Sequence, residues 1–194
     1  MSSPQLPGGW REWRFRLANK VYGPGSRTTP WTWLGDERIA VGNLPTPQSL
    51  PRLANHEGVT HVVNCRATAQ TVFSGDLDME RAVFGRDRVA HASMWDHGRP
   101  QRPEAWAEAA EFAARALDDP GARVLIHCQR GRRRSVLVAY ATLRLRGHGP
   151  EEAARIVLSH RKEAHLVPEY RASVEEWLCR RPPPPEVSRP VPGS

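Results

Sequence analysis

The chain has 194 residues and a mass of 21.8 kDa, a size that suits one domain with short tails and excludes two ordinary domains. With 39% hydrophobic and 25% charged residues, the composition excludes a wholly disordered chain. The net charge of +7 results from 28 basic residues, 26 Arg and 2 Lys, against 21 acidic ones. Such an arginine excess often follows genome composition, so it does not by itself indicate a function.

The two ends of the chain differ in composition from the rest. Residues 1–9 are rich in Ser, Pro and Gly, and residues 181–194 contain a run of four prolines. Proline lacks the backbone donor and clashes with a preceding helical turn, so such a segment neither continues a helix nor pairs within a sheet. We therefore expect disordered tails at 1–9 and 181–194, flanking one ordered domain at 10–180.

Aromatic and basic residues alternate in the segment 10–17, WREWRFRL. We expect Trp13, Phe15 and Leu17 to cap the core, with the arginines left in water. The alternative is that this segment touches an anionic surface.

The rest of the chain alternates between strand-like and helix-like patterns. Apolar and β-branched runs bounded by Gly or Pro predict strands, and apolar residues at helical spacing predict helices. In chain order we expect a strand within 37–45, a buried strand at 60–65, an irregular stretch at 67–86, a strand at 88–95, a helix at 103–117, a strand at 122–128, and helices at 135–146, 150–161 and 168–180. This order predicts an α/β domain with a central, mostly parallel sheet flanked by helices, and its chemistry should lie where strands lead into helices.

One such junction carries the segment HCQRGRRRS. Its Cys128 and Arg134 are separated by five residues, but in a chain with 26 arginines that pair alone is a weak signal. The pattern becomes specific because His127 precedes the cysteine, Gly131 lies within the loop and Ser135 follows the arginine.

The spacing suits the binding of a phosphate group. A five-residue loop that opens a helix can turn successive backbone N–H groups toward an anion, and the helix dipole adds to their effect. Gly131 permits a backbone conformation that a Cβ would penalise, and the planar fork of Arg134 matches two phosphate oxygens. The same donors stabilise a thiolate, so Cys128 should have a lowered pKa and act as a nucleophile toward phosphorus.

This segment resembles the active-site loop of cysteine-dependent phosphatases, and the order of the motifs resembles the dual-specificity group of the protein tyrosine phosphatase family. The matching motifs, which span about 31–178, are AVGNLPTP, VTHVVNC, MWDHG, RVLIHCQRGRRRS and EEAARIVLSHRKEAHLVPEY. The resemblance implies a protein-tyrosine-phosphatase-like fold and the hydrolysis of phosphomonoesters through a phosphocysteine intermediate, without a cofactor.

The resemblance also implies a role for each matching residue. Cys128 attacks phosphorus, Arg134 binds the phosphate and the transition state, Ser135 helps the thiolate to leave, and His127 hydrogen-bonds the loop and supports the thiolate. The expected phosphate-binding residues are Gln129, Arg130, Gly131, Arg132, Arg133 and Arg134.

A general acid must protonate the leaving oxygen and then activate water. Asp96 in the motif MWDHG lies where the family places this residue, after a strand and before the next helix. The alternatives are Asp87, Asp76 and Asp78, which precede that strand and read more simply as solvated loop charges.

The loop is more basic than the usual family pattern. Arg130, Arg132 and Arg133 would suit highly charged substrates such as phosphoinositides or RNA 5′ ends. The alternative is that composition bias placed them there, facing solvent or paired with acids.

Cys65 ends the predicted strand at 60–65. In some relatives a cysteine at the corresponding place forms a reversible disulfide with the nucleophile, here Cys128, and protects it from overoxidation. The alternative is a small buried apolar residue.

These observations favour a phosphatase of phosphorylated proteins, acting on phosphotyrosine and/or phosphoserine and phosphothreonine. A second hypothesis keeps the chemistry but changes the substrate to a phosphoinositide, a nucleotide or an RNA 5′ end. A third is a catalytically silent phosphate-binding module. Nucleic acid and anionic lipid are less favoured partners than a phosphoprotein.

Three further expectations concern the setting of the protein. Three cysteines are too few for a disulfide scaffold and, with no apolar signal segment at the N-terminus, favour a cytoplasmic location. The longest apolar runs, such as 136–143, are too short to span a membrane. No Cys/His cluster has zinc spacing, so we expect no metal.

Overall fold

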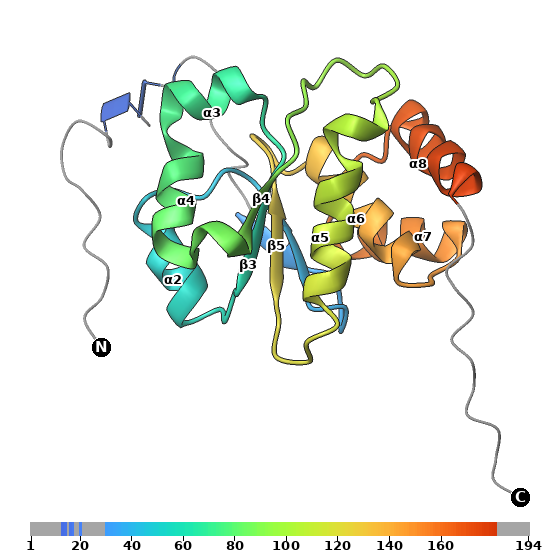
Figure 1. The fold of residues 1–194 in the computed structure, drawn as a ribbon, viewed down its shortest axis with the longest axis horizontal. Helices are drawn as coiled ribbons and strands as arrows, with labels where there is room; N and C mark the ends of the chain where they lie inside the picture. Colours follow the sequence, from blue (N-terminus) through green and yellow to red (C-terminus); the bar gives the residue numbers. More distant parts are fainter. Residues whose placement is uncertain (1–12, 15, 18–19, 21–29, 182–194) are drawn as a thin grey trace, which may run out of the picture.

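The structure, a computed structural model, describes residues 13–14, 16–17, 20 and 30–181; the expected tail at 1–9 and nearly all of the one at 181–194 lie outside these residues. A five-stranded sheet in the order β1-β2-β5-β3-β4 passes through the centre (Figure 1). Strand β1 is antiparallel to β2, and all other neighbours are parallel. The strands are β1 (Trp31–Trp33), β2 (Ile39–Gly42), β3 (His61–Asn64), β4 (Val89–His91) and β5 (Val124–His127). The predicted α/β class with a mostly parallel sheet is confirmed.

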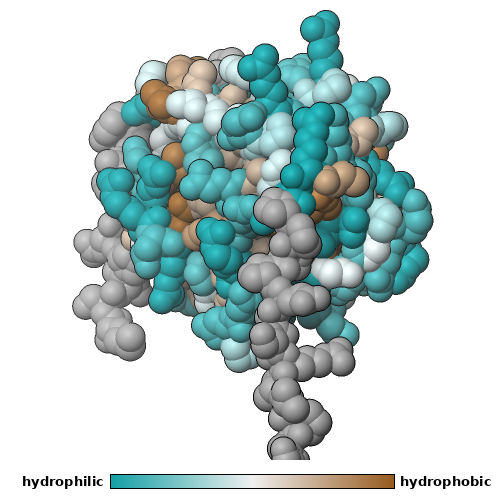
Figure 2. Space-filling model, turned by 45° about the vertical axis from the view of Figure 1, so that its right-hand side comes forward, coloured by the Kyte–Doolittle hydropathy of each residue, from teal (hydrophilic) through white to brown (hydrophobic). Residues whose placement is uncertain are grey.

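Helices cover both faces of the sheet (Figure 1). On one side lie α2 (Ser49–Asn55), α3 (Thr68–Ser74) and α4 (Asp76–Phe84); on the other lie α5 (Ala107–Ala116), α6 (Arg134–Leu145), α7 (Pro150–His160) and α8 (Pro168–Arg180). Two short 3-10 helices, η1 (Arg86–Arg88) and η2 (Pro103–Ala105), precede β4 and α5. Seen with the α7 and α8 side brought forward, the surface is mostly hydrophilic (Figure 2).

Helix α6 is the central helix of the fold. Every residue from Arg134 to Leu143 is buried, because the helix packs on the sheet with one side and on α5, α7 and α8 with the others. A helix that is apolar on nearly all sides must be enclosed in this way. Its burial fixes the position of its first residues, which follow directly from the loop after β5.

The expectation of an irregular stretch at 67–86 was wrong, because α3 and α4 occupy most of it. Their inward positions include polar residues such as Gln70, Asp76 and Glu80, which are buried through hydrogen bonds rather than apolar packing. An amphipathic apolar pattern is therefore weak there. Gly75, with φ of +69°, ends one helix and begins the next.

Smaller differences concern the edges of the sheet and the N-terminal segment. Strand β1 and helix α2 were not predicted, and β4 covers only three residues of the expected 88–95. The expectation that Trp13 caps the core was wrong, because its side chain is 63% exposed. Phe15 lies outside the described residues.

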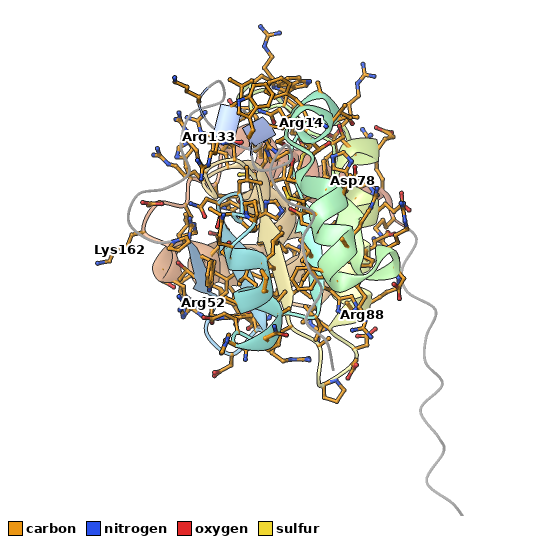
Figure 3. All side chains as sticks on the ribbon, turned by 90° about the vertical axis from the view of Figure 1, so that its left-hand side faces the viewer. Arg14, Arg52, Asp78, Arg88, Arg133 and Lys162 are labelled. Carbon is orange, nitrogen blue, oxygen red and sulfur yellow. The ribbon has the colours of Figure 1, made fainter. Side chains whose placement is uncertain are left out.

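The carboxyl ends of the parallel strands meet at one edge of the sheet. In the register, Gly42 of β2 and Asn64 of β3 both lie opposite His127, the last residue of β5. Figure 3 shows Arg133, from the loop after β5, and Arg14 at this same end of the molecule. Functional side chains that follow these strands are therefore gathered at one edge, as is general for open α/β sheets.

Candidate active site

The β5–α6 loop (residues 128–133) connects a buried strand to the buried helix α6. The Cys128 N–H donates to the carbonyl of Gly42 at 3.3 Å, and the Gln129 carbonyl accepts from the Leu44 N–H at 3.4 Å. These bonds hold the start of the loop against the end of β2. The loop that contains the predicted motif is thus fixed at its first residues and leads into α6.

Gly131 is the position in this loop that requires glycine. Its φ is +62°, and an added Cβ would lie 2.5 Å from the carbonyl group of Gly42 and 2.6 Å from Nη2 of Arg161. Arg161, which follows α7 and is buried, donates from Nε to the Gly131 carbonyl at 2.6 Å. Arg161 therefore holds the loop through a hydrogen bond to its backbone. Its place at the end of a predicted helix did not indicate this role.

The electrostatic surroundings of Cys128 favour its thiolate. Burial alone would raise the pKa of the thiol, but the positive charge of Arg134 and hydrogen bonds from Ser135 and the Arg130 backbone outweigh it and lower the pKa to about 6. The Ser135 hydroxyl lies 3.4 Å from Cys128 Sγ. The nucleophile expected from the sequence is accordingly ionised at neutral pH.

Alkylation by iodoacetamide should report this ionisation directly. Because only the thiolate reacts, the rate at Cys128 should be at its plateau above a pKa of about 6 and should fall as the pH is lowered through that value. The exposed Cys179 serves as the internal control. Peptide mapping after timed reactions measures both rates, and inorganic phosphate should protect Cys128 alone. A Cys128 rate no faster at pH 7 than that of Cys179 would contradict the lowered pKa.

Arg134 is held by two hydrogen bonds from one end of its guanidinium. Its Nη1 donates to Oε1 of Gln70 at 2.9 Å and to the carbonyl of Met94 at 2.9 Å. The buried Nε has no hydrogen-bond partner among the described residues. The Nε donor of this buried guanidinium is therefore available to an incoming anion.

Gln70 is a site residue that the sequence reading missed. It lies on α3, and its Oε1 also accepts a hydrogen bond from the Ala67 N–H at 3.2 Å. The acceptor that orients Arg134 is thus itself fixed at the start of α3. No sequence motif marks this contact, which spans 64 residues of the chain.

A cavity of about 230 Å³ opens beside the loop. Its lining residues are Gln70, Trp95, Asp96, Gln129, Arg130 and Arg134. Asp96 is the one acidic residue among them, so the structure brings the expected general acid into the same cavity as Arg134 and the residues that follow Cys128. The cavity is of a size to admit a phosphate group.

The loop that carries Asp96 is tied to α8. Asp96 Oδ1 accepts a hydrogen bond from the Tyr170 hydroxyl at 3.4 Å and lies 3.7 Å from Nη1 of Arg133. The Gly98 N–H donates to the same Tyr170 hydroxyl at 3.2 Å. These contacts with α8 and with Arg133 therefore hold in place a carboxylate that lines the cavity.

The alternatives to Asp96 lie elsewhere. Asp87 is exposed on η1, before β4, and so at the opposite edge of the sheet from the loop. Asp78 is exposed on α4. The reading of Asp76 as a solvated loop charge was wrong, because it is buried in an ion pair with Arg66 Nη1 at 2.6 Å. Its partner could not be identified without the fold.

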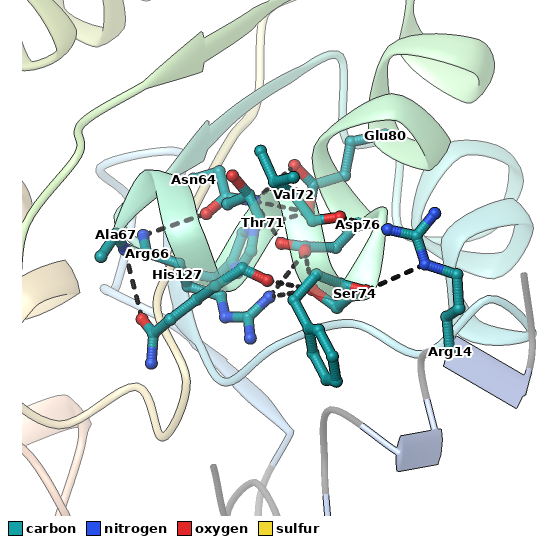
Figure 4. A network of polar contacts seen from close by, with 12 residues as sticks. Arg14, Asn64, Arg66, Ala67, Thr71, Val72, Ser74, Asp76, Glu80 and His127 are labelled. Atoms are coloured by element: carbon teal, nitrogen blue, oxygen red, sulfur yellow. Dashed lines mark hydrogen bonds and ion pairs between the residues drawn. The ribbon is translucent and has the colours of Figure 1, made fainter. Parts of the chain in front are cut away.

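A buried polar network lies beneath the loop (Figure 4). His127 Nε2 lies 2.8 Å from Glu80 Oε1, and both side chains are fully enclosed. Asn64 Nδ2 donates to Glu80 Oε2 at 3.0 Å and to Asp76 Oδ2 at 2.7 Å, and Asp76 accepts from Arg66. The network links β3 and β5 to α4, so the strand end that carries Cys128 is anchored by charged groups.

The His127 imidazole therefore pairs with Glu80 on α4, whereas a hydrogen bond to the loop was expected. Burial would lower the pKa of His127, but the charge and hydrogen bond of Glu80, with the charges of Asp76 and Cys128, raise it above its ordinary value. The raised pKa favours the protonated form of His127, whose positive charge beside Cys128 in the chain favours the thiolate.

The three additional arginines of the loop differ in placement. Arg130 is exposed and lines the cavity, and Arg133 lies near Asp96. Arg132 turns away, with its Nε donating to the Glu163 carbonyl at 3.4 Å and its own carbonyl accepting from the His165 N–H at 2.8 Å. Two of these arginines thus lie where they can meet a substrate.

Cys65 follows β3, beside the strand β5 that leads into Cys128. Its N–H donates to the His127 carbonyl at 2.7 Å, and its side chain is buried. Burial raises the pKa of this thiol well above its ordinary value, and the charge of Cys128 raises it further. Its role as a redox partner remains a prediction.

The described residues offer neither a metal-binding group nor a membrane-spanning helix. No three His, Cys, Asp or Glu side chains in this part of the chain lie together as a metal-binding group. Among the described helices, none combines the length and the apolar character that crossing a bilayer requires.

Comparisons with known proteins give matches at the level of structure. No family model and no curated protein sequence matches the chain. A structure of PTPMT1 in complex with PI(5)P is 21% identical, with a TM-score of 0.64, over 77% of this chain and 94% of that chain. Human DUSP28 is 20% identical (TM-score 0.63, 79% and 95% covered), and the active form of Tk-PTP is 24% identical (TM-score 0.62, 78% and 97% covered). The chain therefore has the fold of the cysteine-dependent tyrosine and dual-specificity phosphatases.

Proposed function

We propose that the protein is a phosphomonoester hydrolase that acts through a phosphocysteine intermediate, with phosphorylated proteins as its first substrate class. The observation that carries this proposal is the low pKa of Cys128, about 6, next to the fixed guanidinium of Arg134. A nucleophile that is ionised at neutral pH and an adjacent cation able to bind phosphate together make up the core of a phosphoryl-transfer site.

In the first step, the Cys128 thiolate attacks phosphorus as the P–O bond to the leaving group breaks. Protonated Asp96 gives its proton to the leaving oxygen. Arg134 and the loop N–H groups bind the three equatorial oxygens, whose charge is spread in the transition state. The products are the dephosphorylated alcohol and a phosphocysteine.

In the second step, water attacks the phosphocysteine. The Asp96 carboxylate takes a proton from that water, the S–P bond breaks, and inorganic phosphate leaves. The Ser135 hydroxyl, 3.4 Å from Sγ, is placed to donate a hydrogen bond to the departing thiolate. Cys128 and Asp96 return to their starting protonation states.

The intermediate provides the direct test. Acid quenching during turnover of an aryl phosphate, with EDTA present, should yield a Cys128 peptide heavier by one PO₃ group. Binding of phosphate without any adduct or product release would favour the catalytically silent module instead. Comparing kcat/KM for phosphotyrosine and phosphoserine peptides with that for soluble phosphoinositides then assigns the substrate class.

A phosphoinositide is the second candidate substrate, and a specific observation favours it. The exposed Arg130 lines the cavity beside Arg134, so a second phosphate on the substrate would find a cation there. The structure of PTPMT1 that resembles this chain is a complex with PI(5)P. A kcat/KM higher for phosphoinositides than for phosphopeptides would favour this candidate.

Replacing Asp96 with asparagine should lower kcat by about 10²-fold for substrates with poor leaving groups, the usual scale of general acid catalysis. The effect should shrink for an aryl phosphate whose leaving group needs no proton. Stopped assays across a series of leaving groups measure this dependence. Asp78→Asn is the matched control, because Asp78 is exposed on α4. Equal losses across the series would place the acid elsewhere.

A further inference from the structure

The exposed large hydrophobic side chains of the described residues are unevenly distributed. Among these residues they are Trp13 (63% exposed), Val72 (66%), Phe73 (37%), Trp95 (53%) and Leu158 (44%). Leu158 lies apart on α7. Of the other four, Trp95 lines the cavity of the candidate active site. Val72 and Phe73 lie on α3, the helix that carries the cavity residue Gln70, and Trp13 lies in the segment that contacts the end of α3. We call these four residues the apolar rim.

Hydrogen bonds join the segments of the apolar rim. Arg14 donates from Nε to the Phe73 carbonyl at 3.1 Å and from Nη2 to the Val72 carbonyl, which places Trp13 next to the end of α3. At the start of α3, the Thr68 N–H donates to the Ser93 hydroxyl at 3.0 Å, two residues before Trp95. Helix α3 therefore connects the two tryptophans, and its Gln70 lines the cavity with Trp95.

The same end of the molecule is basic. Arg14 and Arg133 both lie at this end in Figure 3, and Arg130 is exposed at the cavity. Asp96 is the one carboxylate among the residues that line the cavity. The exposed tryptophans and arginines at this end of the molecule form a surface that combines apolar and positively charged side chains.

We propose that the apolar rim, with Arg14, Arg130 and Arg133, docks on an anionic lipid bilayer and turns the cavity toward the membrane surface. Tryptophan favours the boundary between headgroups and acyl chains, and arginine is attracted by anionic headgroups. The proposal concerns binding and stands whether or not the site hydrolyses phosphoesters.

The form of the rim favours a bilayer over a peptide or RNA. Val72 can neither stack on a base nor donate or accept a side-chain hydrogen bond, yet it is the most exposed of the four. Val72 and Trp13 project from helical segments with about two thirds of their surface in solvent. Projecting apolar side chains can enter a fluid interface without a shaped partner.

Flotation with vesicles tests the proposal on the full chain. Vesicles of phosphatidylcholine with phosphatidylserine should carry the protein, and vesicles of phosphatidylcholine alone should carry much less. The double variant Trp13→Ser/Val72→Ser should bind the anionic vesicles about tenfold more weakly, since two of the projecting apolar side chains are gone. Raised salt should also weaken binding, because the arginines contribute through charge.

Leu158→Ser is the matched control, since it removes an exposed hydrophobic residue from a different face. It should leave vesicle binding unchanged, and near-ultraviolet circular dichroism checks that all variants keep the native packing. Three results would overturn the proposal. The first is that the wild type does not bind anionic vesicles, and the second is that the double variant binds them as well as the wild type does. The third is that the wild type binds a phosphopeptide or an oligonucleotide but no vesicles, and that the double variant loses this binding.

Discussion

Replacing Cys128 with serine should abolish hydrolysis of an aryl phosphate, lowering kcat by at least about four orders of magnitude, on the scale seen when an enzyme loses its nucleophile. A serine hydroxyl at this place would stay protonated, because the field that brings the thiol pKa to about 6 cannot ionise a group that is far less acidic. Steady-state assays with and without EDTA measure the loss.

Binding should survive this substitution. The donors that hold the phosphate are the loop amides and Arg134, which the change of one atom leaves in place, so phosphate should still bind with an affinity within a few fold of the wild type. Cys179→Ser, at an exposed site, is the matched control and should keep full activity. A loss of kcat of less than about tenfold in Cys128→Ser would contradict the covalent mechanism.

The same variant would show which substrate class the site retains. This variant is expected to bind ligands without turning them over. It can therefore be incubated with phosphopeptides or with soluble phosphoinositides, and the amount of bound ligand can be measured. A preference measured in this way separates recognition from chemistry, whereas kcat/KM combines the two.

The sequence predicted the strand–loop–helix junction that carries Cys128 closely. Strand β5 lies within the expected 122–128, and α6 begins one residue before the expected 135. Both elements are buried, so their apolar runs are unbroken and end at polar residues. The signal was strong because the buried apolar elements and the motif residues follow one another in one continuous segment.

The supporting residues were not predictable in the same way. Gln70, Glu80 and Arg161 act on Arg134, His127 and Gly131, which are distant in the chain. Each is polar and buried, so its position carries no apolar period and its partner is set by the tertiary structure alone.

The prediction of α3 and α4 failed for the same reason. The sequence predicted a solvated charge at Asp76 and did not single out Glu80. In the structure both carboxylates are buried against Arg66, Asn64 and His127. Charged residues are rarely buried without partners, and those partners are 10 or more residues away. A helix anchored through such charges looks like a loop when only its composition is considered.

Replacing Arg134 with lysine should lower kcat by about 10³-fold although the positive charge is kept. Nη1 of Arg134 is engaged by Gln70 and Met94, and the guanidinium has a further donor, the buried Nε, for the substrate. A lysine has a single nitrogen and cannot hold both acceptors while binding two phosphate oxygens in a plane. The loss should appear in kcat, because the bidentate contact matters most in the transition state.

The pKa of Cys128 distinguishes the effect of the positive charge at position 134 from the effect of the guanidinium geometry. Arg134→Lys should keep most of the lowered Cys128 pKa, since the charge remains, whereas Arg134→Ala should raise that pKa toward its ordinary value. Iodoacetamide rates against pH measure both. Arg146→Lys, beyond the other end of α6, is the matched control and should behave as the wild type. An Arg134→Lys enzyme within tenfold of wild-type activity would mean that charge alone suffices, and that the planar fork held by Gln70 does not govern the chemistry.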